Sequence, residues 1–241
     1  MRSIDEDLDA AGHAVLPALL DADTCAQLVA GYADDAAYRN RIVMARHNFG
    51  RGEYKYFAYP LPPVVARLRS ELYPALAVIA NRWHEAMGLE PRFPDDHAAF
   101  LARCHAAGQT RPTPLLLAYT AGDYNCLHQD LYGEHVFPLQ VAVLLSEPGR
   151  DFDGGEFVLT EQRPRMQSRV EVVPLRRGDA VVFAVNHRPV AGTRGTSVTF
   201  ALTRPDGLAS LRSSRVAMRH GVSKIRRGTR HTLGVIFHDA T

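Results

Sequence analysis

The chain has 241 residues, of which 46% are hydrophobic and 22% are charged, the composition of an ordinary globular protein of one large domain. The formal net charge of +2 indicates no particular partner, and the three cysteines, Cys25, Cys104 and Cys126, are too few and too far apart for a disulfide scaffold or a thiolate zinc cluster. No stretch approaches the roughly 20 apolar residues of a membrane span, and the acidic N-terminus lacks an apolar signal sequence, so we expect a cytoplasmic protein.

Residues 1–108 show mainly helical patterns. Apolar residues recur there at helical spacing, and acidic residues stand where helix N-caps are expected. An aromatic and basic loop at about 45–60 interrupts the helices. The expected elements, in chain order, are a short strand over 12–20, a helix over 21–32 capped by Asp21 or Asp23, a long helix over 62–87 that is broken or kinked near Pro74, and a helix over 94–108.

Residues 109–241 show a different pattern, of short runs rich in valine, phenylalanine, leucine and isoleucine with turn sequences between them. Several evenly spaced short strands predict a sandwich or a jelly roll. We therefore expect an α+β fold, in which a helical N-terminal region packs on one side of a double-stranded β-helix (a jelly roll) as one functional unit. The expected strands cover 114–119, 136–146, 155–161, 168–175, 179–185, 197–203, 215–222 and 232–238.

The sequence NCLHQD at 125–130 places His128 and Asp130 two residues apart, in what reads as a buried strand. Because side chains alternate along a strand, these two point to one face and Gln129 points to the other. An imidazole and a carboxylate on one inward face suit a divalent metal ion, and a second histidine would complete the facial triad of non-haem iron oxygenases. The chain has neither an HExxH motif nor a cysteine ligand set, which argues against a zinc hydrolase.

The third ligand is expected to be His220. Arg230 follows ten residues later, beyond a turn at Gly228, so the two residues fall on successive strands that project into one barrel. Arg230 and Thr232 share a face, and an inward arginine near a metal is costly unless it binds an anion. Since a planar guanidinium is well shaped for a carboxylate, this region predicts a carboxylate-binding arginine beside the metal.

Four other histidines fit a metal site less well. His135 has the opposite strand parity to the two ligands of the HxD pair, and His187 lies in a turn rich in proline and glycine, with no anion-binding arginine strand after it. His231 is expected to face away from the metal, and His238 lies near the C-terminus. Both of the last two read as structural residues.

These spacings resemble those of a known superfamily. An HxD pair, a distal histidine and an Arg-x-Ser/Thr motif ten residues further on are similar to the Fe(II)- and 2-oxoglutarate-dependent dioxygenases. The resemblance implies that His128, Asp130 and His220 hold Fe(II). It also implies that 2-oxoglutarate chelates the metal through its 2-oxo acid end, that Arg230 and Thr232 bind its far carboxylate, and that O2 takes the remaining metal position.

Other stretches resemble particular branches of that superfamily. The sequence AYTAGDYNCLHQD at 118–130 is similar to AlkB-type nucleic-acid demethylases, in which the tyrosine at the position of Tyr119 binds 2-oxoglutarate. The asparagine that those proteins carry two residues earlier is Leu117 here. DFDGGEF at 151–157 resembles prolyl-hydroxylase-like members. The region 110–241 as a whole resembles bacterial oxygenases acting on alkylated nucleic acid.

This resemblance implies an enzyme that demethylates alkylated DNA or RNA by oxidation, with release of formaldehyde, succinate and carbon dioxide. Such an enzyme prefers single-stranded or damaged sites, because a base must leave its stack to reach a buried oxidant. Two alternatives remain open: a hydroxylase of a protein side chain or a small molecule with the same core, and a non-catalytic, cupin-like binding module. Cupins usually carry HxH, so Asp130 and Arg230 argue against the second alternative.

The segment 41–62 alternates basic and aromatic residues. Bases stack on aromatic rings while cations hold phosphates, so this segment fits a lid over a nucleic acid. The alternative is an ordinary hairpin whose aromatic face packs on the barrel. The stretch 204–230, with eight basic residues and one acid, would form a second wall. The expected substrate contacts are Arg51, Tyr54, Lys55 and Tyr56.

Overall fold

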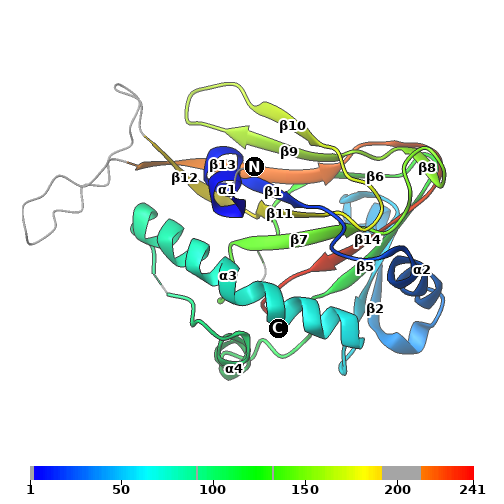
Figure 1. Ribbon diagram of the computed structural model, residues 1–241, viewed down its shortest axis with the longest axis horizontal. Helices are drawn as coiled ribbons and strands as arrows, with labels where there is room; N and C mark the ends of the chain where they lie inside the picture. The colour runs from blue at the N-terminus through cyan, green and yellow to red at the C-terminus, as the bar shows by residue number, and fades with distance from the viewer. Residues whose placement is uncertain (1–2, 91, 132, 192–212) are drawn as a thin grey trace, which may run out of the picture.

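Two antiparallel β-sheets face one another, and the helices α3 (Pro63–Met87) and α4 (His97–Ala106) lie outside the larger of them (Figure 1). The computed structural model describes residues 3–90, 92–131, 133–191 and 213–241. This arrangement is the jelly roll with helical support that the sequence predicts. The strand expected over 197–203 lies outside the described residues. Nowhere in the described ranges is a helix both long and apolar enough to cross a membrane.

The larger sheet is built around β14, which pairs with β5 on one side and with β7 on the other. Strands from the N-terminal region extend both ends of this sheet, so the two regions of the chain share it. The order across the sheet is β1 (His13–Leu16), β11 (Ala180–Ala184), β7 (Leu139–Leu144), β14 (Ile225–Val235), β5 (Leu115–Thr120), β4 (Glu53–Phe57) and β2 (Tyr38–Val43), with β8 (Phe152–Gly154) paired to the start of β14.

The smaller sheet is built around β13, which directly precedes β14 in the chain but lies in the opposite sheet (Figure 1). The connection between β13 and β14 therefore joins the two sheets at one end. The order across the smaller sheet is β10 (Arg169–Val173), β9 (Phe157–Gln162), β13 (Ser213–Val222), β6 (Tyr124–His128) and β3 (Gly50–Arg51), with β12 (His187–Ala191) paired to the first half of β13.

The two faces of β14 have different roles, because side chains alternate along a strand. Leu233 and Val235 are fully buried on the outer face, in the same core cluster as Trp83 of α3. Thr232 and Gly234 face the other sheet and line the cavity between the sheets. The apolar contact with α3 thus fixes which side chains of β14 point inward.

Two short helices begin at polar side chains that accept backbone hydrogen bonds. Asp21 caps α2 (Ala22–Gly31), as one of the two predicted choices. Ser3 and Glu6 form a capping box at the start of α1 (Ile4–Ala11), a helix that the sequence pattern did not predict. The Ser-x-x-Glu spacing is the signal that could have indicated it.

The helix α3 runs through Pro74 without the break that the sequence suggested. A proline inside a helix costs about 3 kcal/mol, because it removes one hydrogen bond and crowds the preceding turn. The neighbours Tyr73 and Leu76 are buried in the main core. Packing of this apolar face on the sheet therefore outweighs the local preference of proline.

Residues 38–57 form strands where we expected a loop at about 45–60. β2 and β4 pair as a hairpin, and β4 also pairs with β5, which places the hairpin at the edge of the larger sheet. The N-terminal region is therefore less helical than predicted. Pairing with a strand about sixty residues away depends on tertiary context that local sequence does not contain. Two 3-10 turns, η1 (Asp35–Ala37) and η2 (Met44–His47), lie before and within this hairpin.

A buried ion pair ties the C-terminal residues to α3. Arg69 Nη2 lies 2.7 Å from Asp239 Oδ1, and both side chains are at most 2% exposed. Tyr59 and His105 each lie 2.8 Å from the other carboxylate oxygen. Burial alone would raise the pKa of Asp239, but the charge of Arg69 and these hydrogen bonds hold it below its ordinary value.

We predict that Asp239→Ala lowers the free energy of unfolding by about 3 kcal/mol, because it leaves the buried charge of Arg69 without its partner. Asp153→Ala is the matched control, since it removes an exposed pair with Arg227 and should cost less than about 1 kcal/mol. Urea denaturation of both variants measures the difference. Equal losses in the two variants would show that the buried pair does not hold the C-terminus.

Candidate metal centre

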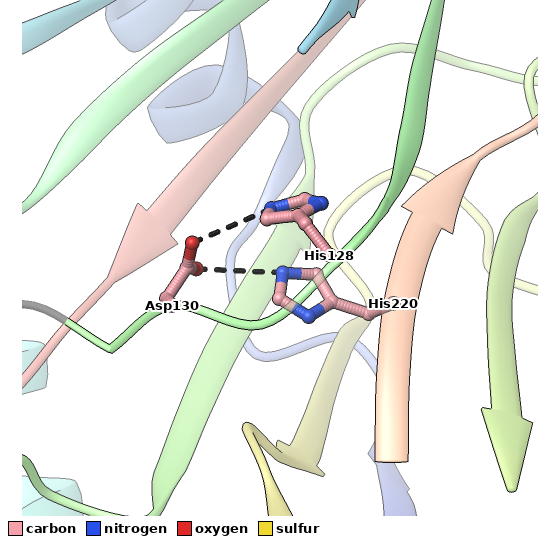
Figure 2. A group of neighbouring side chains, drawn as sticks. All are labelled: His128, Asp130 and His220. Atoms are coloured by element: carbon pink, nitrogen blue, oxygen red, sulfur yellow. Dashed lines mark ion pairs between the residues drawn. The ribbon is translucent and has the colours of Figure 1, made fainter. Parts of the chain in front are cut away.

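Three side chains with metal-binding atoms converge on the inner side of the smaller sheet (Figure 2). His128 is the last residue of β6, Asp130 follows it by two positions, and His220 lies on β13. Backbone pairing places His220 directly opposite His128. The register of β13 against β6 therefore brings together residues that are far apart in the sequence.

The ligand atoms of these three residues all lie within 4.8 Å of one another. Asp130 Oδ1 lies 3.4 Å from Nε2 of His128, and Asp130 Oδ2 lies 3.4 Å from Nε2 of His220. The Nδ1 atom of His128 lies 2.7 Å from the carbonyl oxygen of Cys126. When Nδ1 donates its hydrogen to this carbonyl, Nε2 of His128 keeps a free lone pair. This is the tautomer of a metal-ligating histidine.

The electrostatics keep a carboxylate at the centre of this group. Burial alone would raise the pKa of Asp130, but the hydrogen bonds and charges of His128 and His220 hold it far below its ordinary value. The pKa of His128 is raised, because its contact with Asp130 outweighs burial. Burial lowers the pKa of His220 more than Asp130 raises it. An ionised carboxylate and a neutral imidazole are the forms that bind a metal ion.

The local structure differs from the buried strand that the HxD pair suggested. β6 ends at His128, so Asp130 lies beyond the strand, and β6 is partly exposed along its length. Among the described strands, β6 pairs with β13 on one side and with the two-residue β3 on the other. Gly50 of β3 has a φ of +129°, and a Cβ there would lie 2.4 Å from the carbonyl oxygen of Tyr124. The absence of a side chain at Gly50 therefore lets β3 come close enough to pair with β6.

A buried arginine faces the smaller sheet from the larger one. Arg230 is 2% exposed, and backbone pairing places it opposite Tyr119 of β5. Its Nη1 donates to the hydroxyl of Thr232, while its Nε makes no hydrogen bond with any described residue. Burial lowers the pKa of Arg230 to about 10. A buried cation with no carboxylate in contact leaves a position for an anion.

A glycine makes room for this arginine. A Cβ on Gly155 would lie 2.9 Å from Cδ of Arg230 and 2.2 Å from Cδ1 of Ile225. Gly155 also has a φ of +64°, in the left-handed region that favours glycine. The turn before β9 is therefore shaped around the side chain of Arg230.

A cavity of about 310 Å³ connects the metal-binding group with Arg230. The smaller sheet contributes the three metal-binding residues, and the larger sheet contributes the arginine and an aromatic wall. The volume suits a small organic molecule together with part of a larger one. The residues that line the cavity include Phe49, Tyr54, Tyr56, Tyr119, Gln140, Phe183, Arg230 and Thr232.

The four predicted substrate contacts do not all lie on the cavity side of the hairpin. Tyr54 and Tyr56 line the cavity, and Arg51 is exposed on β3. Lys55 points to the other side of β4, where its Nζ lies 2.6 Å from Asp35 and only 5% of the residue is exposed. Lys55 is therefore removed from the predicted contacts, because the alternation along β4 that brings the tyrosines inward turns it outward.

Phe49 and Gln140 are among the cavity residues that the sequence did not predict. Phe49 was noted only as one of several aromatic residues in its segment, yet it lines the cavity and stacks on His47 with ring centres 5.3 Å apart. Gln140 interrupts an apolar strand, and that isolated polar residue is the signal that could have identified it.

The histidines set aside above lie away from the three ligands. His231 is on the outer face of β14, with its ring centre 5.7 Å from that of Tyr32. His238 is fully buried and accepts a hydrogen bond from the backbone of Phe137. His135 and His187 are not part of the metal-binding group.

Two arginines of the basic stretch near the C-terminus are paired with acids. Arg226 lies 3.4 Å from Glu156, and Arg227 lies 2.7 Å from Asp153. The part of the stretch at 204–212 lies outside the described residues. The exposed bases Arg219 and Lys224 of the same stretch make no ion pair with any residue of the described ranges, and neither do Arg46 and Arg51 on the hairpin side. Exposed positive charges without an acid partner in these ranges therefore occur in both segments.

The chain is 45% identical over 213 residues to uncharacterised proteins from two strains of Mycobacterium tuberculosis, with 86% of this chain and 84% of each relative covered. Among solved structures, it resembles a prolyl-4-hydroxylase from Pseudomonas putida, with a TM-score of 0.50 and 15% identity over 99% of this chain and 97% of the other. It also resembles a 2OG-Fe(II) oxygenase family oxidoreductase from Burkholderia pseudomallei, with a TM-score of 0.52 and 16% identity over 99% and 91%.

At these identities the solved structures bear out the jelly-roll fold. A family model, Oxygenase-NA, described as "Oxygenase, catalysing oxidative methylation of damaged DNA", matches residues 52–240. That match covers most of the chain, including both strands that carry the metal-binding residues. It overturns the alternative of a non-catalytic binding module. The chain belongs to the Oxygenase-NA family and is an oxygenase.

Proposed function

We propose that this oxygenase depends on Fe(II), 2-oxoglutarate and O2 and that it removes methyl groups from alkylated nucleic acid. The observation that carries the proposal is the position of Arg230, a buried cation that contacts no acid of the described ranges, across one cavity from two histidines and an aspartate. A ligand that satisfies both groups at once must combine an anionic end with a metal-chelating end.

The donor set fits a ferrous ion. His128, Asp130 and His220 provide two imidazole nitrogens and one carboxylate on one side of the cavity, which leaves the positions that face the cavity open. The hydrogen bond from His128 to the carbonyl of Cys126 fixes the ring in the orientation for binding. These residues would hold the metal, with Phe183 packed 4.6 Å from the ring of His220 as an apolar support.

The opposite wall fits 2-oxoglutarate. Its far carboxylate would pair with Arg230 and accept a hydrogen bond from the hydroxyl of Tyr119, which pairing of β14 with β5 places opposite Arg230. Thr232 holds one nitrogen of the guanidinium in place. Pairing with a carboxylate also offsets the cost of burying the cation, which the lowered pKa of about 10 reflects.

When bound together, the metal, the cosubstrate and oxygen supply an oxidant for an unactivated C–H bond. The residues of the chain position the substrate and keep water out of the cavity. Hydroxylation of an N-methyl carbon gives a hemiaminal, which breaks its C–N bond and releases formaldehyde. The oxidation therefore removes a methyl group from a damaged base, so we propose demethylation as the reaction on DNA or RNA.

The hairpin side of the cavity supports a nucleic acid as the substrate. Tyr54 and Tyr56 form an aromatic wall inside the cavity, with ring centres 5.3 Å apart, and Phe49 with His47 stands at its exposed edge. Arg51 carries an unpaired charge on the neighbouring strand. Aromatic rings beside free cations suit an extruded base and its phosphates.

A protein side chain is the rival substrate. A solved neighbour of similar fold is described as a prolyl-4-hydroxylase. The same metal and cosubstrate sites would serve that reaction, so only the substrate end of the cavity distinguishes the two. The three free cysteines suit the cytoplasm, where either substrate would be present.

We predict that His128→Ala, Asp130→Ala and His220→Ala each weaken metal binding by more than about 100-fold, because each removes one of three ligands. Anaerobic calorimetry with Fe(II) or Mn(II) measures the affinity, and circular dichroism verifies the fold. His231→Ala, on the outer face of the same β-sandwich, is the control and should bind metal normally. Normal metal affinity in His220→Ala would remove that residue from the centre.

We predict that Gly155→Ala raises the KM for 2-oxoglutarate about tenfold or more, because the added methyl group displaces the side chain of Arg230. Gly108→Ala is the control. It has a φ of +81°, but a Cβ there would meet no atom within 4 Å, so it introduces the same backbone strain far from the cavity. Equal KM values in the two variants would mean that Gly155 does not shape the anion site.

The function itself is tested by offering methylated single-stranded DNA and RNA, proline-containing peptides and small metabolites, with succinate and formaldehyde as the readouts. We expect formaldehyde from a methylated strand. Arg51→Ala should weaken binding to every sequence about equally. It should also reduce the slope of log affinity against log salt concentration by about one, the loss of one phosphate contact. Arg226→Ala, whose charge is paired with Glu156, should change neither property. Salt-independent binding with turnover only on a peptide or metabolite would contradict the nucleic-acid assignment.

A further inference from the structure

Two glutamines line the cavity, and their side-chain NH2 groups differ in hydrogen bonding. Nε2 of Gln129 donates to the side chain of Asn186 at 2.8 Å and to the carbonyl of Met218 at 2.7 Å. Gln140 is 4% exposed, and its Nε2 has no partner among the described residues. Leaving a buried amide donor unpaired costs free energy, so an unpaired donor beside a cavity indicates a ligand that carries an acceptor.

Gln140 lies at the opposite end of the cavity from Arg230. It precedes Val141 of β7, which pairs with Val235 of β14, five residues beyond Arg230. Five residues of a strand span about 17 Å, whereas the carbon chain of 2-oxoglutarate is about 6 Å long. Both ends of the cosubstrate are already accounted for, by Arg230 and by the metal. The amide of Gln140 is therefore left for the primary substrate.

The surroundings of Gln140 place it near the reacting carbon. Its partner across the sheet is Phe183, whose ring packs 4.6 Å from the ring of His220. The rest of this end of the cavity is apolar or aromatic, and includes Tyr56, Leu115 and Ile236. A flat heterocycle fits between such walls, and the amide is the hydrogen-bonding group that would distinguish one heterocycle from another.

We propose that Gln140 selects the substrate base, by donating a hydrogen bond to a carbonyl oxygen next to the methylated ring nitrogen. This inference rests on the proposed function and specifies its substrate. In 3-methylcytosine the methylated nitrogen has the O2 carbonyl beside it. In 1-methyladenine the corresponding neighbours are an amino group, which is a donor, and a C–H. Both methylated bases carry a positive charge. They therefore differ mainly in the group beside the methylated nitrogen, a carbonyl in one and a C–H in the other, to which Gln140 would donate.

The test compares kcat/KM for two single strands that are identical except for one 3-methylcytosine or one 1-methyladenine. The full-length iron-loaded enzyme should prefer 3-methylcytosine. In Gln140→Met and in Gln140→Glu, which keep the length of the side chain but remove the donor, the ratio of 3-methylcytosine to 1-methyladenine should fall about tenfold, the loss of one hydrogen bond. A purely structural role would reduce both rates alike, and Arg226→Ala should keep the original ratio.

The outcomes separate the inference from the proposed function. If both bases are demethylated and the ratio stays unchanged in both variants, or if the KM for 2-oxoglutarate changes instead, Gln140 does not read the base. Retention of the ratio in Gln140→Glu but not in Gln140→Met would also overturn the inference, because the amide oxygen would then be the reading atom. If neither methylated strand releases formaldehyde while a peptide or metabolite yields succinate, the proposed function fails, and the selection of a base fails with it.

Discussion

A buried positive charge without an acid in contact among the described residues is the constraint around which this molecule is arranged. The guanidinium of Arg230 lies 5.8 Å from the ring centres of Tyr119 and Phe152, and no carboxylate of the described ranges forms an ion pair with it. A protein keeps such a group only if a ligand or a network of fixed dipoles stabilises it. Gly155 leaves room for the side chain of Arg230, and the hydroxyl of Thr232 accepts a hydrogen bond from it.

The two-sheet fold explains how Arg230 comes to face the group of His128, Asp130 and His220. β13 and β14 are joined by two residues yet belong to different sheets, so one short connection sets His220 and Arg230 on opposite walls of one cavity. The outer face of β14 is fixed by apolar contact with α3, and this determines the inward direction of Arg230. Stability and chemistry thus depend on the same strand.

The sequence predicted those parts of the site that depend on short spacing. The shared face of Arg230 and Thr232 and the opposite face of His231 follow from strand alternation, which is a local property. Asp130 instead reaches the metal-binding group from beyond the end of β6. The prediction that Lys55 contacts the substrate was wrong, because the direction of this side chain is set when β4 pairs with β5. The role of Gln140 was also missed, because a polar residue in an apolar strand acquires meaning only when the cavity beside it is known. The capping box of α1 was readable but was overlooked.

The edge position of the β2–β4 hairpin separates substrate choice from chemistry. Arg230, His128 and His220 lie on β14, β6 and β13, and Asp130 follows β6 by two positions, whereas Tyr54 and Tyr56 lie on β4 of the hairpin. β2 is the outermost strand of the larger sheet, so it can change without altering the strands that carry the metal-binding residues. Residues 44–52 are more constrained, because β3 within them pairs with β6 and Gly50 leaves no room there for a side chain. A new specificity is therefore better introduced on the strands of the hairpin than by changing the length of the segment between them.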